Sequence, residues 1–332
     1  MPLNPLKWPH RAKLIAAFAA LYVVWGSTYL AIRIGLEAEL PPALFAGMRL
    51  VPAGLLLLAF ARTRGARLRI RFDEYRIVAT VGILLLVGGM YSTFLSERSI
   101  PSGLAALIVA LLPLWVALAE SLIPGMDRPT ARGYLGLVIG FAGLGVLMAP
   151  RLTGIAGTPQ ELIGVATQIL GTWLWTAGSI LSKRRPVKAD ALVATGYEML
   201  TAGAVLLGIG TLKGEWPAFT LTVSGALALA YLIVFGSCVA FTAFVWLLRH
   251  APASKVMTYA YVNPVIAVFL GWLAGTLGLV PPEPVDGWVL AGMAIIVAGV
   301  ALTTSAPTRP VTLPAPSPEA ESALAEAGAE VL

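Results

Sequence analysis

The chain contains a series of apolar stretches of about 20 residues, and these constrain its fold more than any other feature. An α-helix rises about 1.5 Å per residue, so such a stretch crosses the ~30 Å hydrocarbon layer of a membrane. Lipid offers no partners to backbone amides, and the alternating pattern of a membrane barrel is absent, so helices are expected. Ten spans are predicted: 14–34, 42–61, 77–96, 103–121, 133–149, 161–182, 191–212, 225–248, 255–274 and 287–304.

Composition agrees with an all-α integral membrane protein. Hydrophobic residues make up 58% of the chain and charged residues only 12%, about half of the ~25% found in ordinary soluble domains. A single cysteine, Cys238, excludes an intramolecular disulfide and any CxxC motif. The chain has no HExxH, GxSxG or Walker A motif and no cluster of His, Cys and Asp. We therefore expect neither an enzyme nor a bound cofactor or metal.

The distribution of positive charge predicts the orientation in the membrane. Of the 23 lysines and arginines, 18 lie in the termini and connections on one side of the predicted bundle and three on the other. Positive residues favour the cytoplasmic side, so both termini are expected there. The net charge of +6 then reflects topology and contact with anionic lipid headgroups, and it does not indicate nucleic-acid binding.

The two halves of the chain resemble each other. Arg98, Pro101 and Pro113 match Arg249, Pro252 and Pro264 at a spacing of 151 residues, and Trp25 matches Trp175 at 150. Five spans per half would place the second half in inverted topology, an arrangement suited to alternating access around a midplane site. The predicted segments are a cytoplasmic N-terminus (1–13), a first repeat (14–149), a linker (150–160), a second repeat (161–304) and a disordered cytoplasmic tail (305–332).

Three motifs resemble the EamA-type members of the drug/metabolite transporter superfamily. They are Trp25-Gly-Ser-Thr-Tyr, Pro101-Ser-Gly-Leu-Ala-Ala-Leu with Pro113-Leu-Trp, and Pro252-Ala-Ser with Tyr261-Val-Asn-Pro264-Val. The resemblance covers residues 12–304. It implies a ten-helix carrier of two repeats in the bacterial inner membrane that exports amino acids, related metabolites or drugs.

Polar and aromatic residues inside the spans are candidates for a central substrate cavity. In the sixth span they recur at intervals of four, three and four, which is one helix face. The alternative is packing between helices, because Ser, Thr and Gln often bridge neighbouring helices. The candidates are Trp25, Ser27, Thr28, Tyr91, Trp115, Gln168, Thr172, Trp175, Ser179, Tyr259 and Asn263. Trp25 and Trp175 are expected on opposite walls of one chamber, and Trp173 is a candidate for a lipid-facing position.

Charged residues and prolines mark further positions. Arg49 and Glu198 lie deepest in the spans, where charge is costly unless paired or hydrated. Arg49 is a candidate for holding a carboxylate group and Glu198 for carrying a coupling proton; both also fit structural roles, and a mutual ion pair stays open. Glu120, near a span end, is expected at the interface. Pro113 and Pro264 are expected to kink or break their helices, either beside substrate or as bends alone.

These features together favour a secondary transporter that exports small amphipathic metabolites, with amino acids as the leading class. The alternatives are an exporter of drugs or other metabolites and a passive channel or facilitator. The expected partners are a small-molecule substrate, membrane lipids and, if transport is coupled, protons. The sequence does not define the oligomeric state.

Overall fold

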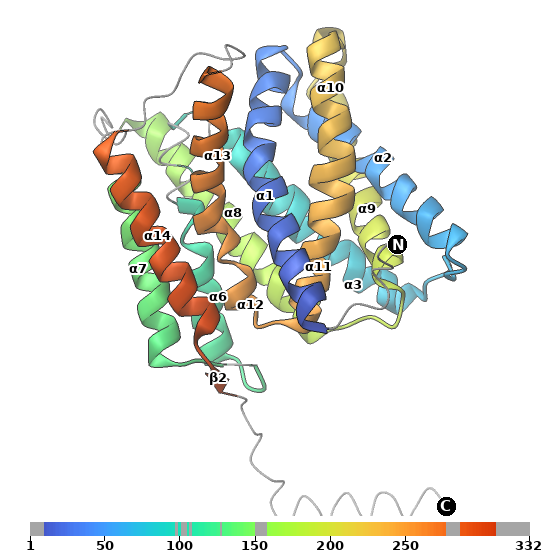
Figure 1. Cartoon of the computed structure of the whole chain (residues 1–332). Helices are drawn as coiled ribbons and strands as arrows, with labels where there is room; N and C mark the ends of the chain where they lie inside the picture. Colours follow the sequence, from blue (N-terminus) through green and yellow to red (C-terminus); the bar gives the residue numbers. More distant parts are fainter. Residues whose placement is uncertain are drawn as a thin grey trace, which may run out of the picture.

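Helices form most of the chain in the computed structural model, which describes residues 10–96, 99–100, 105, 108–126, 128–149, 158–276 and 286–309. They pack into one bundle (Figure 1). The first half contains α1 (His10–Glu37), α2 (Pro42–Thr63), α3 (Phe72–Gly82), η2 (Ile83–Met90), α4 (Tyr91–Ser96), α6 (Leu112–Leu122) and α7 (Ala131–Met148). The second contains α8 (Pro159–Arg184), α9 (Ala191–Leu212), η4 (Trp216–Ala218), α10 (Val223–Tyr231), η5 (Leu232–Phe241), α11 (Thr242–His250), α12 (Ala253–Val256), α13 (Tyr259–Thr276) and α14 (Gly287–Ser305).

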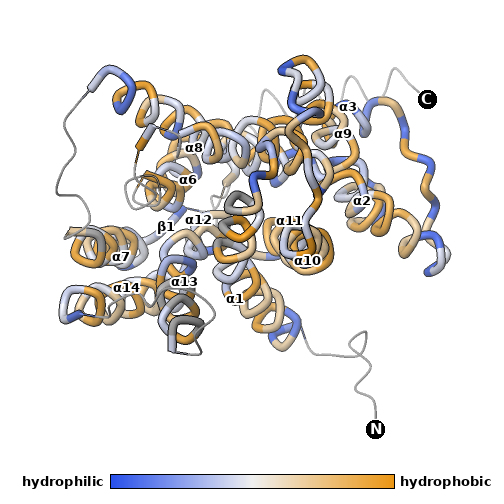
Figure 2. The backbone as a smooth tube through the Cα atoms, turned by 90° about the horizontal axis from the view of Figure 1, so that it is seen from above, coloured by the Kyte–Doolittle hydropathy of each residue, from blue (hydrophilic) through white to orange (hydrophobic). Residues whose placement is uncertain are grey.

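Several of these helices are long and apolar enough to cross a membrane. Within the described ranges there are six: His10–Ile32, Pro42–Thr63, Phe72–Ser96, Ala191–Leu212, Val223–His250 and Gly287–Ser305. They coincide with six of the ten predicted spans. Figure 2 shows hydrophobic residues along most of the helices and hydrophilic ones in connections such as that between α2 and α3. The expected membrane fold is therefore supported, and ten spans remain a prediction.

The helix starts follow from short polar signals in the sequence. Thr158 caps α8 in a capping box with Glu161, and Asp190 accepts a hydrogen bond from Leu192 N at the start of α9. Thr222 and Asp286 cap α10 and α14 in the same manner. Such caps satisfy amides that the first turn leaves without intrahelical partners, which fixes where the apolar segments enter the bundle.

Two π-helical segments interrupt long helices at corresponding places in the two halves. The segment η2 lies between α3 and α4, and η5 lies between α10 and α11. Their first residues, Ile83 and Leu232, are 149 residues apart. Since π-helical bulges often occur at functional sites, this shared irregularity directs attention to the helices that pack against η2 and η5.

Glycines let two pairs of helices pack closely. A Cβ on Gly299 of α14 would lie 2.4 Å from Gly140 N of α7, and a Cβ on Gly136 would lie 2.8 Å from Gly299 O. The Gly136-x-x-x-Gly140 pattern of α7 therefore lies directly against Gly299 of α14. In the same way, a Cβ on Gly54 of α2 would lie 2.8 Å from Gly196 O of α9.

Both of these pairs are antiparallel. In α7 and α14, Gly136 contacts Thr303 whereas Gly143 contacts Ile296, so residue numbers increase along one helix as they decrease along the other. In α2 and α9, Gly47 meets Leu207 and Gly54 meets the segment around Gly196. Figure 1 shows α7 and α14 side by side along their length.

The described ends of the chain differ in detail from the predicted segments. Helix α1 begins at His10, inside the predicted N-terminal segment, and residues 1–9 lie outside the described part. At the other end, β2 (Thr308–Arg309) pairs antiparallel with β1 (Arg128–Pro129), so ordered structure continues past residue 305. Residues 150–157 of the predicted linker and 310–332 of the predicted tail also lie outside the described residues.

Candidate functional site

Aromatic rings from both halves of the chain meet in the interior. Trp25 of α1 lies edge-on to Trp175 of α8, with ring centroids 5.8 Å apart, and edge-on to Tyr259 of α13 at 4.8 Å. Phe244 of α11 lies 5.3 Å from Trp25 and 5.6 Å from Trp175. We call these four residues the aromatic cluster. Edge-to-face and tilted rings at such distances attract one another beyond the burial of their area.

This arrangement corrects one expectation. Trp25 and Trp175 do not form opposite walls of a chamber, because their rings are in direct contact. The sequence pattern identified both as inward-facing, but periodicity along one helix carries no information about the distance to another. Phe244 was not predicted, since a phenylalanine in an apolar span has no distinguishing pattern.

The two indole groups differ in their hydrogen bonding. Trp25 Nε1 donates to Gly236 O of η5 at 3.0 Å, while Trp175 Nε1 is buried with no hydrogen-bond partner among the described residues. Trp175 packs instead against η2, because a Cβ on Gly89 would lie 2.7 Å from its Cε3 atom. Buried polar groups without a partner are uncommon, so the free indole N–H is a candidate donor to a ligand.

The predicted polar face of α8 is buried, as expected of a face that avoids lipid. Its hydrogen bonds, however, stay within the protein. Gln168 accepts from Ser96 Oγ at 2.5 Å and donates to Thr93 Oγ1 at 3.3 Å. Thr172 and Ser179 donate to carbonyls of their own helix at 2.7 Å. These three side chains therefore fit the packing alternative better than a ligand-binding wall.

The hydroxyl groups beside Trp25 are also engaged. Thr28 Oγ1 donates to Trp25 O and Ser27 Oγ to Val24 O, both at 2.7 Å. Ser27 Oγ also shares a hydrogen bond of 2.5 Å with the hydroxyl of Tyr231 at the end of α10, a partner that the sequence analysis missed.

Arg49 and Glu198 are both buried, but they do not pair with each other. Arg49 Nε donates to Ser237 Oγ of η5 at 2.8 Å. The cation that acts electrostatically on Glu198 is Arg249 of α11, and Glu198 Oε2 has no hydrogen-bond partner among the described residues. The two residues lie on the antiparallel helices α2 and α9, in which Gly54 meets the segment around Gly196.

The remaining predicted residues lie in separate surroundings. Tyr91 is buried and accepts a hydrogen bond from Lys213 Nζ at 3.0 Å. Trp115 packs edge-on against Trp173 at 6.2 Å, and Trp173 is 54% exposed, as expected of a lipid-facing side chain. Asn263 is buried, with its Oδ1 unpartnered in the described structure.

The two prolines act differently. Pro113 lies in the first turn of α6, directly after a turn at residues 110–111 that interrupts the helix within the fourth predicted span. Pro264 lies inside α13, which continues through it; the interruption in the ninth span falls earlier, at the turn of Met257 and Thr258. A proline near a helix start loses little, because amides of the first turn have no intrahelical acceptor.

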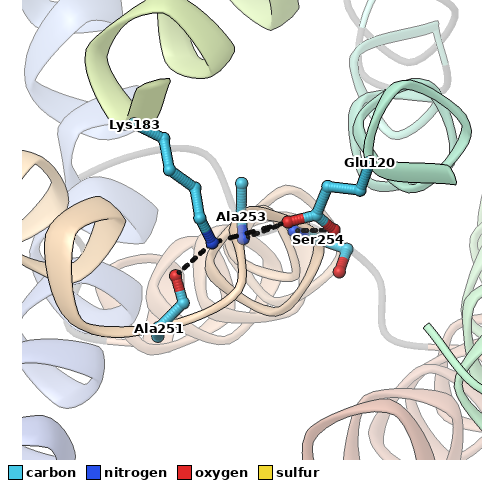
Figure 3. A network of polar contacts seen from close by, with 5 residues as sticks. All are labelled: Glu120, Lys183, Ala251, Ala253 and Ser254. Atoms are coloured by element: carbon cyan, nitrogen blue, oxygen red, sulfur yellow. Dashed lines mark hydrogen bonds and ion pairs between the residues drawn. The ribbon is translucent and has the colours of Figure 1, made fainter. Parts of the chain in front are cut away.

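A polar network around Glu120 was not anticipated. The carboxylate is fully buried inside the protein, and it accepts from Ala253 N at 2.7 Å and from Ser254 N at 3.2 Å. Lys183 Nζ lies 3.6 Å from its Oε1 atom and donates to Ala251 O at 3.1 Å (Figure 3). The distribution of positive charge had placed the chain segments around Glu120, Lys183 and Ala253 on the same side of the bundle. The two backbone donors could not be predicted, because every residue type except proline has the same backbone amide.

The described residues contain no group of three or more His, Cys, Asp and Glu side chains that could hold a metal ion. The candidate site thus consists of the aromatic cluster, the two π-helical segments beside it and the buried charges. It offers aromatic surfaces, one indole N–H without a described partner and the buried guanidinium of Arg49.

Comparisons with known proteins agree with this description. The sequence profile of the EamA-like transporter family matches residues 12–149 and again residues 162–305. The uncharacterized inner membrane transporter YedA of Escherichia coli (strain K12) is 36% identical over 306 residues, which are 91% of this chain and 95% of YedA. The uncharacterized transporter YvbV of Bacillus subtilis (strain 168) is 27% identical, covering 89% of this chain and 92% of YvbV.

Solved structures share the fold, among them one crystal structure. It superposes with a TM-score of 0.75 at 22% sequence identity, covering 89% of this chain and 97% of the other. The similarity to YedA, together with the apolar helices, confirms the expected location as a multi-pass protein of the inner membrane. The two profile matches cover most of the sequence, and the chain therefore belongs to the EamA-like transporter family of the drug/metabolite transporter superfamily.

Proposed function

We propose that the protein is a secondary transporter that exports small amphipathic metabolites, with amino acids as the leading class, by alternating access. In this mechanism the two halves have inverted topology and exchange conformations around a central site. The substrate would bind at the aromatic cluster, where residues from both halves meet. Drugs or other metabolites are the alternative cargo.

Helix packing supports the inverted relation. If the halves correspond as the sequence register predicts, α2 is equivalent to α9 and α7 to α14. Each equivalent pair packs antiparallel through glycines. Repeats related by an axis along the membrane normal would run parallel, whereas inverted repeats run antiparallel.

The contacts between non-equivalent helices support the same relation. Helix α1 packs against η5, and α8 packs against η2. Exchanging the two halves converts the first contact into the second. Such reciprocal contacts are what the proposal needs, because an exchange of the two halves would give a second conformation of similar energy.

The observation that carries the proposal is the contact between Trp25 and Trp175, which are matched residues of the two halves. A ligand held there touches both moving parts. Any shift of one half against the other would then change the binding surface, so binding and movement are coupled.

The test is counterflow in proteoliposomes with radiolabelled L-leucine, L-phenylalanine and L-threonine. An alternating-access carrier accumulates labelled substrate against an unlabelled internal pool and saturates. A channel gives unsaturable flux with no stimulation from the opposite side, and that result would reject the proposal.

A pair of tryptophan variants localises the site. Trp175→Ala removes a ring from the aromatic cluster and is expected to lower counterflow at least tenfold. Trp173→Ala is the matched control, because this nearby ring is 54% exposed. Equal activity of both variants at equal membrane levels would remove the aromatic cluster from the binding site.

A further inference from the structure

Arg49 lies next to the aromatic cluster. Its side chain is 8% exposed, and Nε donates to Ser237 Oγ of η5. The neighbouring residue, Gly236, accepts the hydrogen bond from Trp25 Nε1. A Cβ on Gly236 would lie 3.0 Å from one terminal nitrogen of Arg49 and 3.0 Å from Thr28 Cγ2. The guanidinium and the indole of Trp25 therefore flank the same glycine, in a π-helical segment that leaves room for both.

The charge of Arg49 is not balanced within the described structure. A guanidinium carries five N–H donors, and Ser237, its described hydrogen-bond partner, is neutral. Neither buried carboxylate of the described chain contacts Arg49: Glu120 pairs with Lys183, and the cation that acts electrostatically on Glu198 is Arg249. A buried cation without an anion is costly, so such a position favours a site that an anionic group completes.

We propose that Arg49 binds the carboxylate of the transported substrate, while the apolar part of the substrate lies against Trp25 and its neighbours. A single planar guanidinium fits a carboxylate with two parallel hydrogen bonds. Aromatic faces accept both apolar groups and an ammonium group, so amino acids and other amphipathic carboxylic acids belong to the same class. This inference rests on the proposed function and names its substrate class.

The test compares acids with their amides in the counterflow assay. The probes are L-leucine and L-phenylalanine, their amides, which lack the carboxylate, and the lipophilic cation tetraphenylphosphonium. The wild-type protein is expected to carry the acids with at least tenfold lower half-saturating concentration than the amides. Arg49→Gln should abolish that preference, and Arg49→Lys should restore part of it.

A glycine substitution provides a second, independent variant that keeps the charge. Gly236→Ala places a methyl group against Arg49 and Thr28 and is expected to raise the half-saturating concentration for the acids. Gly208→Ala in α9 is the matched control, because a Cβ there meets nothing within 4 Å. Monodisperse elution and thermal unfolding of each variant establish that it is folded.

The outcomes separate the two claims. Three results would overturn the carboxylate site without contradicting the proposed transport function. They are equal counterflow of acids and amides, counterflow of the cation alone, and a preference for acids that persists in Arg49→Gln. Flux of every probe without saturation or stimulation from the opposite side would count against the proposed function, and with it the site.

Discussion

The network of Glu120 and Lys183 allows a quantitative test of the fold. At 3.6 Å between Oε1 and Nζ, an effective dielectric constant of about 20 gives an attraction of about 4–5 kcal/mol. The lysine side chain is 17% exposed, and desolvation of both charges opposes the attraction, so we expect a net coupling of about 1–2 kcal/mol.

The backbone contacts of Glu120 add to this figure. A hydrogen bond to a charged group contributes about 1.5–3 kcal/mol, and Glu120→Gln keeps only one oxygen for the amides of Ala253 and Ser254. Together the two effects predict a loss of about 3 kcal/mol in the free energy of unfolding for Glu120→Gln.

The measurement is a double-mutant cycle that combines Glu120→Gln with Lys183→Met. The free energy of unfolding of each variant is obtained from reversible denaturant unfolding in mixed micelles. Glu215→Gln is the matched control, since Glu215 accepts one backbone hydrogen bond, from Leu44 N at 2.9 Å, and is only partly buried. It should cost about 1 kcal/mol. A Glu120→Gln variant as stable as this control, or a cycle with no coupling, would refute the reasoning.

Three further outcomes are expected. Gly299→Ala should lower the free energy of unfolding by about 2 kcal/mol or more in thermal unfolding, because the added methyl group would meet the backbone of α7. In the control Gly145→Ala the methyl group meets nothing within 4 Å, so the free energy of unfolding should change by less than about 0.5 kcal/mol. If Glu198 carries a coupling proton, Glu198→Gln should flatten the pH profile of uptake; an unaltered profile would leave this residue structural. Lys213→Met should lower the free energy of unfolding by less than about 1 kcal/mol, because Lys213 is exposed and donates only to the phenol oxygen of Tyr91. A larger loss would contradict this interpretation.

The sequence predicted buried faces better than it predicted partners. Gln168, Thr172, Trp175 and Ser179 are all buried, because helical periodicity identifies residues that share a face. Which atoms they bond depends on the depth and rotation of neighbouring helices. Helical periodicity gives neither the depth nor the rotation of a neighbouring helix. The sequence therefore could not decide whether Gln168 bonds to other helices or faces a substrate cavity.

Single residues without a pattern account for most of what was missed. Glu120 is one carboxylate near the end of an apolar span, a position that usually lies at the interface. In the buried position its oxygens are satisfied by two backbone amides at the start of α12, which residues of any type can supply. Ser237 became relevant only through the π-helical course of η5, which brings it to Arg49.

The hydrogen bonds of the two tryptophans connect the asymmetry of the structure with the proposed cycle. Trp25 and Trp175 are matched in the sequence at a spacing of 150 residues, yet only the indole N–H of Trp25 has an acceptor among the described residues. If the halves exchange conformations, the acceptor passes from Trp25 to Trp175, because η2 then takes the place of η5. Which of the two indole N–H groups lacks an acceptor then depends on the conformation of the transporter. A substrate that accepts a hydrogen bond from this N–H would bind one conformation more tightly and so favour it.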